Sequence, residues 1–136
     1  MVEVKIDYLG DLRCKAVHGP SGQSIITDAP VDNKGKGEYF SPTDLVAASL
    51  GTCMLTIMGI AANGHKIDMA GTTCKVMKEM ASSPSRMIGK LTVTINVPTK
   101  LTDEQKKILE HAAMHCPVHK SIHAEVQMDV KFNWGA

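Results

Sequence analysis

Apolar and polar residues alternate with a period of two in four stretches of the chain, which is the pattern of strands with one buried face. Two less regular stretches, 23–28 and 72–80, are predicted to pair with them as further strands. The turn formers at 82–85 precede the alternating stretch that begins at Leu91. The four stretches are Val2 to Tyr8, Leu12 to Ala16, Leu91 to Val97 and Val126 to Phe132. We expect a mostly antiparallel sheet.

A different pattern runs from Leu45 to Ala62, where eighteen consecutive residues carry no charge and thirteen of them are Ala, Val, Leu, Ile, Met or Cys. This run predicts a helix that is apolar on every side. It is also long enough for a membrane span. We favour a buried central helix, because two glycines and three hydroxyl residues dilute the run, and the amphipathic strands on both sides need a packing partner.

Capping residues mark both ends of this helix. Ser41 is the predicted N-cap, a proline follows at the first helical position, and Asp44 comes three residues after the cap. Phe40 is placed to pack on Leu45 as a hydrophobic staple. The pair Asn63-Gly64 marks the end of the helix.

The length of this helix predicts an oligomer. From Pro42 to Ala62 it would measure roughly 30 Å, while a chain of this size has a radius of gyration of roughly 14 Å. One sheet can cover only one side of the helix. We therefore expect an obligate two-fold dimer in which the central helices pack together.

A second helix is predicted to begin at Thr102, which forms a capping box with Gln105. Its apolar stripe ends at Cys116, whose side chain is thus expected to point inward. Pro117 suits the first position of a new helix, so Cys116 becomes the predicted N-cap of a short helix through Ile122. The fold class is α+β, with the order ββ(β)–α–ββ–α–β.

Composition limits the organisation and the partners of the protein. The 136 residues are 43% apolar, which suits one domain over residues 1–136. A net charge of +1 predicts no nucleic-acid partner and no membrane surface. The charged, alternating N-terminus is unlike a secretory signal, so we expect a cytoplasmic protein whose cysteines are thiols.

Four cysteines are the candidate reactive groups, and they form no C-x-x-C motif. Cys14 and Cys74 fall where core residues of strands are expected. Cys53 lies among apolar neighbours in the long helix, where a small core residue with a raised pKa is one interpretation. Cys116, at a helix N-terminus with histidines and a lysine nearby, is predicted from this chemistry to be the more acidic thiol.

The motif Ser41-Pro-Thr-Asp-Leu-Val-Ala-Ala-Ser-Leu-Gly-Thr-Cys53, followed by His115-Cys-Pro-Val118, resembles the OsmC/Ohr family of osmotically inducible and organic hydroperoxide resistance proteins. The resemblance covers essentially the whole chain. It implies an intertwined two-fold dimer and a thiol peroxidase without a cofactor. In that family, Cys53 would be the peroxidatic thiol and Cys116 the resolving thiol, with a disulfide closing between them at the dimer interface. A dithiol donor such as a lipoylated protein would restore the thiols.

The chain departs from the family where a glutamate would follow the helix-starting proline. Thr43 stands there, and the acid Asp44 comes one position later. Asp44 either only completes the N-cap or orients a cationic group beside Cys53. Arg13 is the natural candidate for that cation, and an exposed arginine on a strand face is the alternative.

Two further groups of residues complete the candidates. Tyr39 and Phe40 could wall an apolar peroxide pocket, although the staple alone explains Phe40. Histidines 111, 115, 119 and 123 have the spacing of a zinc-binding helix, but Pro117 interrupts it, so we predict no metal site. A redox sensor, an apolar-ligand-binding protein and a zinc module remain as alternatives to the peroxidase. The sequence identifies neither the peroxide nor the reductant.

Overall fold

The computed structural model describes residues 1–135, and the chain forms two compact units, Met1–Val46 and Ala47–Ala136. The first unit contains β1 (Val4–Gly10), β2 (Arg13–His18), β3 (Ser24–Asp28) and a short 3-10 turn, Val31–Asn33. Helix α1 (Pro42–Gly64) begins there and continues into the second unit. The second unit adds β4 (Thr73–Ala81), β5 (Met87–Val97), α2 (Asp103–Met114), α3 (Pro117–Ser121) and β6 (Gln127–Trp134).

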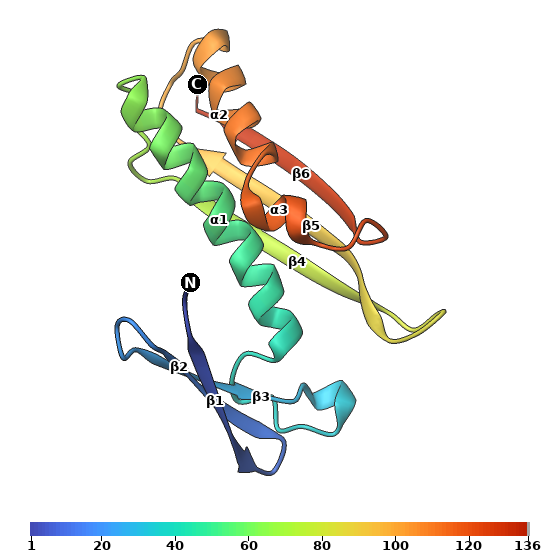
Figure 1. The fold of residues 1–136 in the computed structure, drawn as a ribbon. Helices are drawn as coiled ribbons and strands as arrows, with labels where there is room; N and C mark the ends of the chain where they lie inside the picture. Colours follow the sequence, from blue (N-terminus) through green and yellow to red (C-terminus); the bar gives the residue numbers. More distant parts are fainter. Residues whose placement is uncertain (136) are drawn as a thin grey trace. The chain divides into compact units, whose positions relative to one another are not determined.

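The strands form two three-stranded sheets, in the orders β1-β2-β3 and β4-β5-β6. The expectation of one sheet is therefore wrong, while the α+β class is confirmed. Three of the four strand pairs are antiparallel. Strands β5 and β6 are parallel, because α2 and α3 lie between them in the chain and carry it back to the starting edge (Figure 1).

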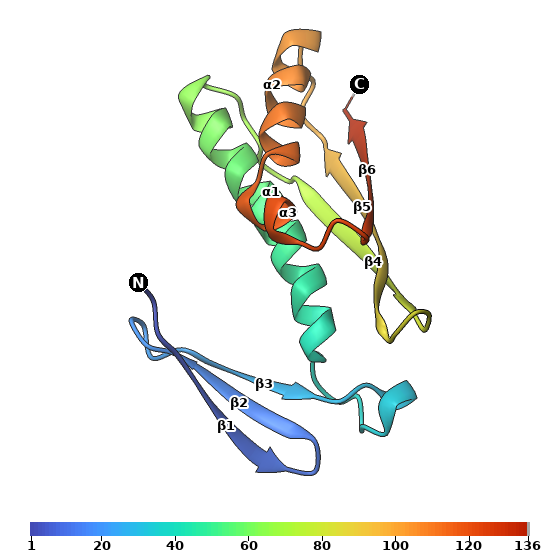
Figure 2. The same ribbon diagram turned by 45° about the vertical axis from the view of Figure 1, so that its right-hand side comes forward.

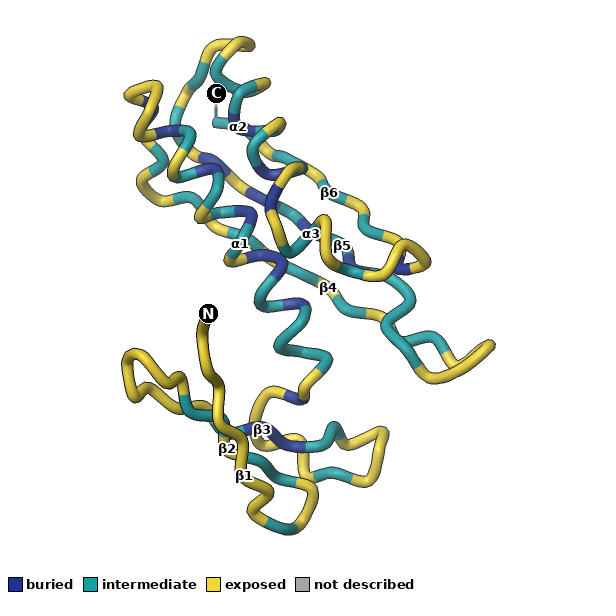
Figure 3. The backbone as a smooth tube through the Cα atoms, viewed as in Figure 1, coloured by how far each residue is buried: buried dark blue, intermediate teal, exposed yellow. Residues whose placement is uncertain are grey.

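In the first unit, one face of the sheet is apolar and open. Val4, Ile6 and Tyr8 share this face with their cross-strand neighbours on β2 and β3, and they are 53%, 65% and 67% exposed. Strand β1 is accordingly drawn as exposed along its length in Figure 3. The prediction of a buried face is wrong for the single chain. Leu12 is also not a strand residue, since it lies in the turn before β2 with a φ of 64°.

The second unit contains the core. Helices α1, α2 and α3 cover one face of β4-β5-β6 (Figures 1 and 2). From Leu91 to Val97, every second residue of β5 faces the helices and is at most 1% exposed, as the period-two pattern predicted. The core side chains from these elements are Leu50, Met54, Met58, Ala62, Leu91, Val93, Ile95, Val97, Leu109 and Ala113.

Helix α1 begins as the capping pattern predicts. The Ser41 N–H donates to Asp44 Oδ2 at 3.0 Å, and the Asp44 N–H donates to Ser41 Oγ at 3.1 Å. Phe40 is 59% exposed, so a staple on Leu45 leaves most of its ring in solvent. At the other end the helix includes Gly64, and the residue in the left-handed conformation is Lys66, with a φ of 54°.

The same helix is long and apolar enough to cross a membrane, with a mean hydropathy of 2.0 over its best 18-residue window. A third of that window is buried inside the chain. A core helix of a soluble protein has these properties too. The buried residues recur along one stripe, at Leu50, Met54 and Met58, which is the spacing of a helix packed on a sheet.

Helix α1 lies close to β4 at Gly51. A Cβ atom added there would lie 3.0 Å from Val76 Cγ2 and 3.2 Å from Cys74 Sγ. A Cβ added at Gly59, on the same helix, would have no atom within 4 Å in the chain. The small residue at 51 therefore sets how closely the helix packs on the sheet.

We predict that Gly51→Val lowers the free energy of unfolding by about 1 to 3 kcal/mol, because the added methyl groups overpack the contact with β4. Gly59→Ala is the matched control, and it should raise the same quantity by up to about 1 kcal/mol through helix propensity. Urea titration followed by circular dichroism measures both. Equal stability of Gly51→Val and the wild type would contradict this account of the packing.

Candidate active site

The second unit brings Cys53 and Cys116 together. Cys53 is half-buried on α1, two residues beyond Gly51, and Cys116 is the N-cap of α3 with no exposed surface. The Cys53 side chain packs against the core cluster that contains Cys116, and it is close enough to raise the pKa of the Cys116 thiol. Both are free thiols. Residues 63 positions apart in the chain thus form a pair of neighbouring thiols, as the predicted redox pair requires.

The local sequence explains how Cys116 is placed. Thr102 and Gln105 form the predicted capping box at the start of α2, and Cys116 caps α3 by accepting a hydrogen bond from the His119 N–H at 3.3 Å. Pro117 occupies the first helical position of α3 and ends the line of α2. The chain turn at Cys116–Pro117 directs the thiol into the core.

The pKa of the Cys116 thiol is raised above its ordinary value, so the prediction of an acidic Cys116 is wrong. Burial is the largest cause, and the hydrogen bond and charge of Cys53 raise the pKa further. The backbone N–H groups of His119 and Val118 act in the opposite direction. A helix of five residues supplies too little dipole to outweigh the loss of hydration.

The histidines near Cys116 are divided between two helices, so their spacing of four does not place them all on one helix. His115 Nδ1 lies 2.7 Å from the His111 carbonyl oxygen, and the two rings stack with centroids 4.1 Å apart. His119 belongs to a separate helix, α3. Within residues 1–135, no group of three or more histidine, cysteine or acidic side chains is arranged to hold a metal ion.

The two remaining cysteines lie in strands. Cys74 on β4 faces α1 beside Gly51, and burial raises the pKa of its thiol. Cys14 on β2 lies opposite Tyr8 and Thr27 in the first sheet. These strand positions agree with the prediction that both cysteines serve packing.

Arg13 is bound by two acidic residues of the first unit. Its Nε donates to Asp28 Oδ1 at 3.3 Å, and its Nη2 donates to Asp28 Oδ2 at 3.0 Å and to Glu38 Oε1 at 2.9 Å. These hydrogen bonds raise the pKa of Arg13 and lower the pKa of Asp28. The guanidinium also lies over the Tyr39 ring, 4.8 Å from its centroid. Arg13 thus lies on a strand, 26% exposed and paired with two acids, and its role beside Cys53 stays a prediction.

The acids that hold Arg13 are Asp28, at the end of β3, and Glu38, in the segment before α1. Asp28 is fully buried, and its Oδ2 also accepts the Glu38 N–H at 3.0 Å. Asp44, the acid that the sequence suggested, caps α1. A role for Asp44 beside Cys53 stays a prediction. The signal for Asp28 was the pairing register of β2 and β3, which sets Arg13 opposite Asp28.

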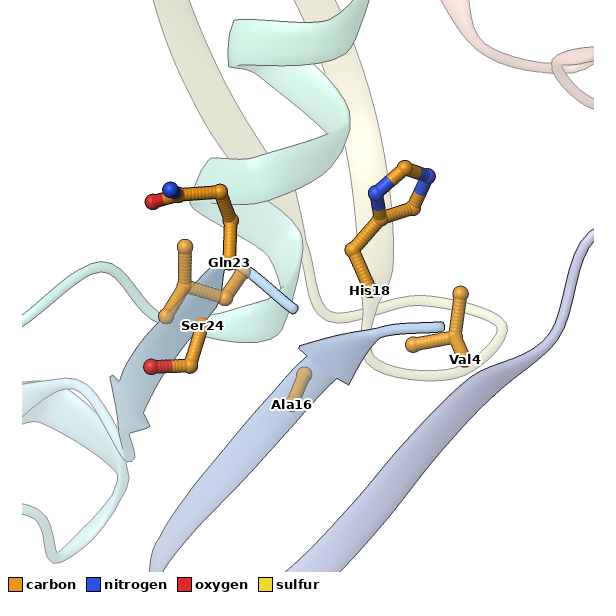
Figure 4. A pocket seen from close by; sticks show the side chains of 6 residues that line it. Val4, Ala16, His18, Gln23 and Ser24 are labelled. Carbon is orange, nitrogen blue, oxygen red and sulfur yellow. The ribbon is translucent and has the colours of Figure 1, made fainter. Parts of the chain in front are cut away.

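Tyr39 and Phe40 were predicted to wall a peroxide pocket, and this prediction is not tested. In the first unit, Tyr39 stacks on Arg13, while the Phe40 carbonyl accepts the Asp28 N–H at 3.0 Å. A shallow apolar hollow of this unit lies elsewhere on the sheet, as Figure 4 shows. Its lining residues are Val4, Ala16, His18, Gln23, Ser24 and Ile25.

Solved structures resemble this chain over nearly its whole length. A candidate osmotic stress induced and detoxification response protein from Psychrobacter arcticus 273-4 is 50% identical, with a TM-score of 0.91 over 97% of this chain and 96% of that one. An OsmC organic hydroperoxide resistance protein from Legionella pneumophila is 16% identical, with a TM-score of 0.80 over 98% and 96%. An organic hydroperoxide resistance protein from Elizabethkingia anophelis is 17% identical, with a TM-score of 0.73 over 98% and 96%.

No protein with a curated description matches the chain. The sequence profile of the OsmC-like protein family matches residues 35–131, a span that contains both Cys53 and Cys116. Together with the 50% identity to the Psychrobacter protein, this match shows that the chain belongs to the OsmC/Ohr family.

Proposed function

We propose that the protein is a thiol-dependent peroxidase that reduces organic hydroperoxides through Cys53 and Cys116. The observation that carries this proposal is the pairing of the two thiols inside the second unit, with Cys116 buried against Cys53. Membership of the OsmC/Ohr family supports it. So do the structural relatives that are named organic hydroperoxide resistance proteins.

The proposed reaction uses the two thiols in order. The Cys53 thiolate attacks one oxygen of the peroxide, the O–O bond breaks, and the alcohol leaves while Cys53 becomes a sulfenic acid. The Cys116 sulfur then attacks the Cys53 sulfur, water leaves, and a disulfide forms. An external dithiol, such as a lipoylated protein, donates two electrons and two protons to restore both thiols. No cofactor enters these steps.

The environment of Cys116 suits a resolving thiol better than a peroxidatic thiol. A buried thiol with a raised pKa is largely protonated near neutral pH, so it is a poor first nucleophile. Cys53 raises the pKa of Cys116 further, which suits a thiol that reacts only after its neighbour has been oxidised. Cys53 is half-buried rather than fully buried and is therefore the more accessible of the two to a substrate.

Arg13 is proposed to stabilise the Cys53 thiolate. Arginine is always charged and presents five N–H donors in a rigid fork, which suits a developing anion. Arg13 keeps its fork in a fixed orientation through Asp28 and Glu38. Tyr39 and Phe40 are proposed as apolar neighbours of the peroxide.

The proposed partner is a second copy of the chain. The first unit exposes an apolar sheet face, and α1 exposes Ile60 at 63%. Open apolar area of this kind on strands and a helix is unfavourable in water, and a two-fold dimer covers both surfaces at once. We further propose a cytoplasmic protein that is bound neither to nucleic acid nor to a membrane.

We predict that one equivalent of cumene hydroperoxide produces a Cys53–Cys116 disulfide in the wild type. Cys116→Ser should oxidise as fast as the wild type and stop at a sulfenic acid on Cys53, because no resolving thiol remains. Cys53→Ser should lose the fast phase by at least about 100-fold, because the remaining thiol is buried and protonated. Stopped-flow kinetics and peptide mapping measure these outcomes.

Cys74→Ser is the matched control, since it removes a partly buried thiol without touching the pair, and its fast phase should equal that of the wild type. A fast phase that survives in Cys53→Ser but not in Cys116→Ser would reverse the roles. Oxidation without turnover in the presence of dihydrolipoamide, thioredoxin or glutathione would favour a redox sensor over a peroxidase.

We also predict an obligate dimer at micromolar concentration, because the apolar face of the first sheet has no cover within the chain. Ile6→Asp places a charge at the centre of that face and should dissociate or unfold the protein. Lys5→Asp, on the opposite face of the same strand, is the control and should remain dimeric. Sedimentation velocity decides, and a stable folded monomer of the wild type would refute the dimer.

A further inference from the structure

The last step of the proposed reaction is the reduction of the disulfide, and the second unit places the two sulfurs of the pair differently for that step. Cys116 has no exposed surface. Cys53 is half-buried on α1, and Thr52 and Thr56 beside it on the helix are exposed. Helix α3, which Cys116 caps, lies beside the middle of α1 (Figures 1 and 2). Solvent can therefore reach Cys53 but not Cys116.

Access matters because a thiolate attacks a disulfide in a directed way. It approaches one sulfur along the S–S axis, from the side opposite the sulfur that leaves. For attack on Cys116, that side is the one turned away from Cys53, and it lies in the core of the second unit. For attack on Cys53, the nucleophile can follow the path that the peroxide uses in the proposed reaction. No further opening of the chain is needed there.

The backbone on both sides of Cys116 holds its sulfur in the core. The Cys116 N–H donates to the Ala113 carbonyl at 3.4 Å, and the Cys116 carbonyl accepts the Lys120 N–H at 3.2 Å. The Cys116 Sγ accepts the His119 N–H at 3.3 Å. Turning the sulfur toward the surface would break these hydrogen bonds, which makes such a movement unfavourable.

The hydrogen bond to Sγ also favours Cys116 as the sulfur that leaves. A departing thiolate carries negative charge, and a backbone N–H that already points at the sulfur stabilises this charge without rearrangement. The His119 N–H is in that position. The N–H groups of His119 and Val118 both act to lower the pKa of Cys116.

The raised pKa of Cys116 acts in the opposite direction, because a more basic thiolate leaves more slowly. Part of this increase comes from Cys53, and that part is lost once Cys53 is bonded to the reductant. Burial, the largest cause, remains. A difference in basicity changes a rate by a graded factor, whereas a sulfur that the nucleophile cannot reach is not attacked. Access therefore decides the direction of the exchange.

We infer that the external dithiol attacks the Cys53 sulfur and that Cys116 leaves as the thiolate. This assignment rests on the proposed function and deepens it. The reductant's sulfur bonds to Cys53, the Cys53–Cys116 bond breaks, and its electron pair goes to Cys116, which takes up a proton. The second thiol of the reductant then attacks the reductant's sulfur in the mixed disulfide. Cys53 leaves as the thiolate, and the reductant departs as an internal disulfide.

The test uses mercaptoethanol, a small thiol with one sulfur, on wild-type protein whose Cys53–Cys116 disulfide has been formed with diamide. Acid stops the exchange after short reaction times, and mass spectrometry of peptic peptides locates the mercaptoethanol adduct. We expect adducts on Cys53 to exceed those on Cys116 by at least about tenfold at the earliest times. Equal amounts, or an excess on Cys116, overturn the inference.

Two controls show whether burial causes the preference. In the same oxidised protein unfolded in guanidinium chloride, the excess on Cys53 should fall below about threefold, because both sulfurs are then exposed. Cys74→Ser removes a partly buried thiol outside the pair and should keep the wild-type excess. An excess that persists on unfolding, or that disappears in Cys74→Ser, also overturns the inference.

Diamide forms the disulfide without peroxide, so this result is independent of peroxidase activity. A wild type that shows the excess on Cys53 but no peroxide turnover would reject the proposed function and leave the direction of attack intact. If diamide forms no Cys53–Cys116 disulfide in the folded protein, the inference is wrong.

Discussion

The packing of α1 on the β4-β5-β6 sheet is the constraint on which the candidate site depends. The stripe of Leu50, Met54 and Met58 must meet the alternating apolar residues of β5, and this fixes the rotation of the helix about its axis. Gly51 allows the helix to approach β4. Cys53, three residues after Leu50, is then turned toward α3, where Cys116 lies. The thiol pair is a consequence of how the core is filled.

The same packing determines the chemistry of Cys116. The turn at Pro117 directs its sulfur into the core, so the loss of hydration outweighs the two backbone N–H groups that would stabilise a thiolate. A resolving thiol has no need to ionise before its partner is oxidised, because the attack on the sulfenic acid occurs within one molecule at high effective concentration. Burial that would disable a first nucleophile is compatible with this second role.

The first unit presents a different balance of forces. Two residues of its strands are buried, Thr27 and Asp28, and both are polar. Backbone hydrogen bonds and the Arg13–Asp28–Glu38 cluster stabilise it from within, while the apolar face carrying Ile6 and Tyr8 lacks cover in the chain. A unit of this kind gains most of its hydrophobic stabilisation from another surface, which is the physical basis for the proposed dimer.

The sequence by itself determined most of the elements and where the helices begin. Period-two alternation located the strands, and the uncharged run located α1. The capping residues Ser41, Thr102 and Cys116 were each confirmed. These patterns depend on residues that are close together in the chain, so the sequence alone reveals them. The resemblance of two motifs identified Cys53 and Cys116. Only the tertiary structure decided that the strands divide into two sheets, that Cys116 is buried and that Asp28 holds Arg13. Burial and strand register depend on contacts between distant segments, and no local pattern encodes them.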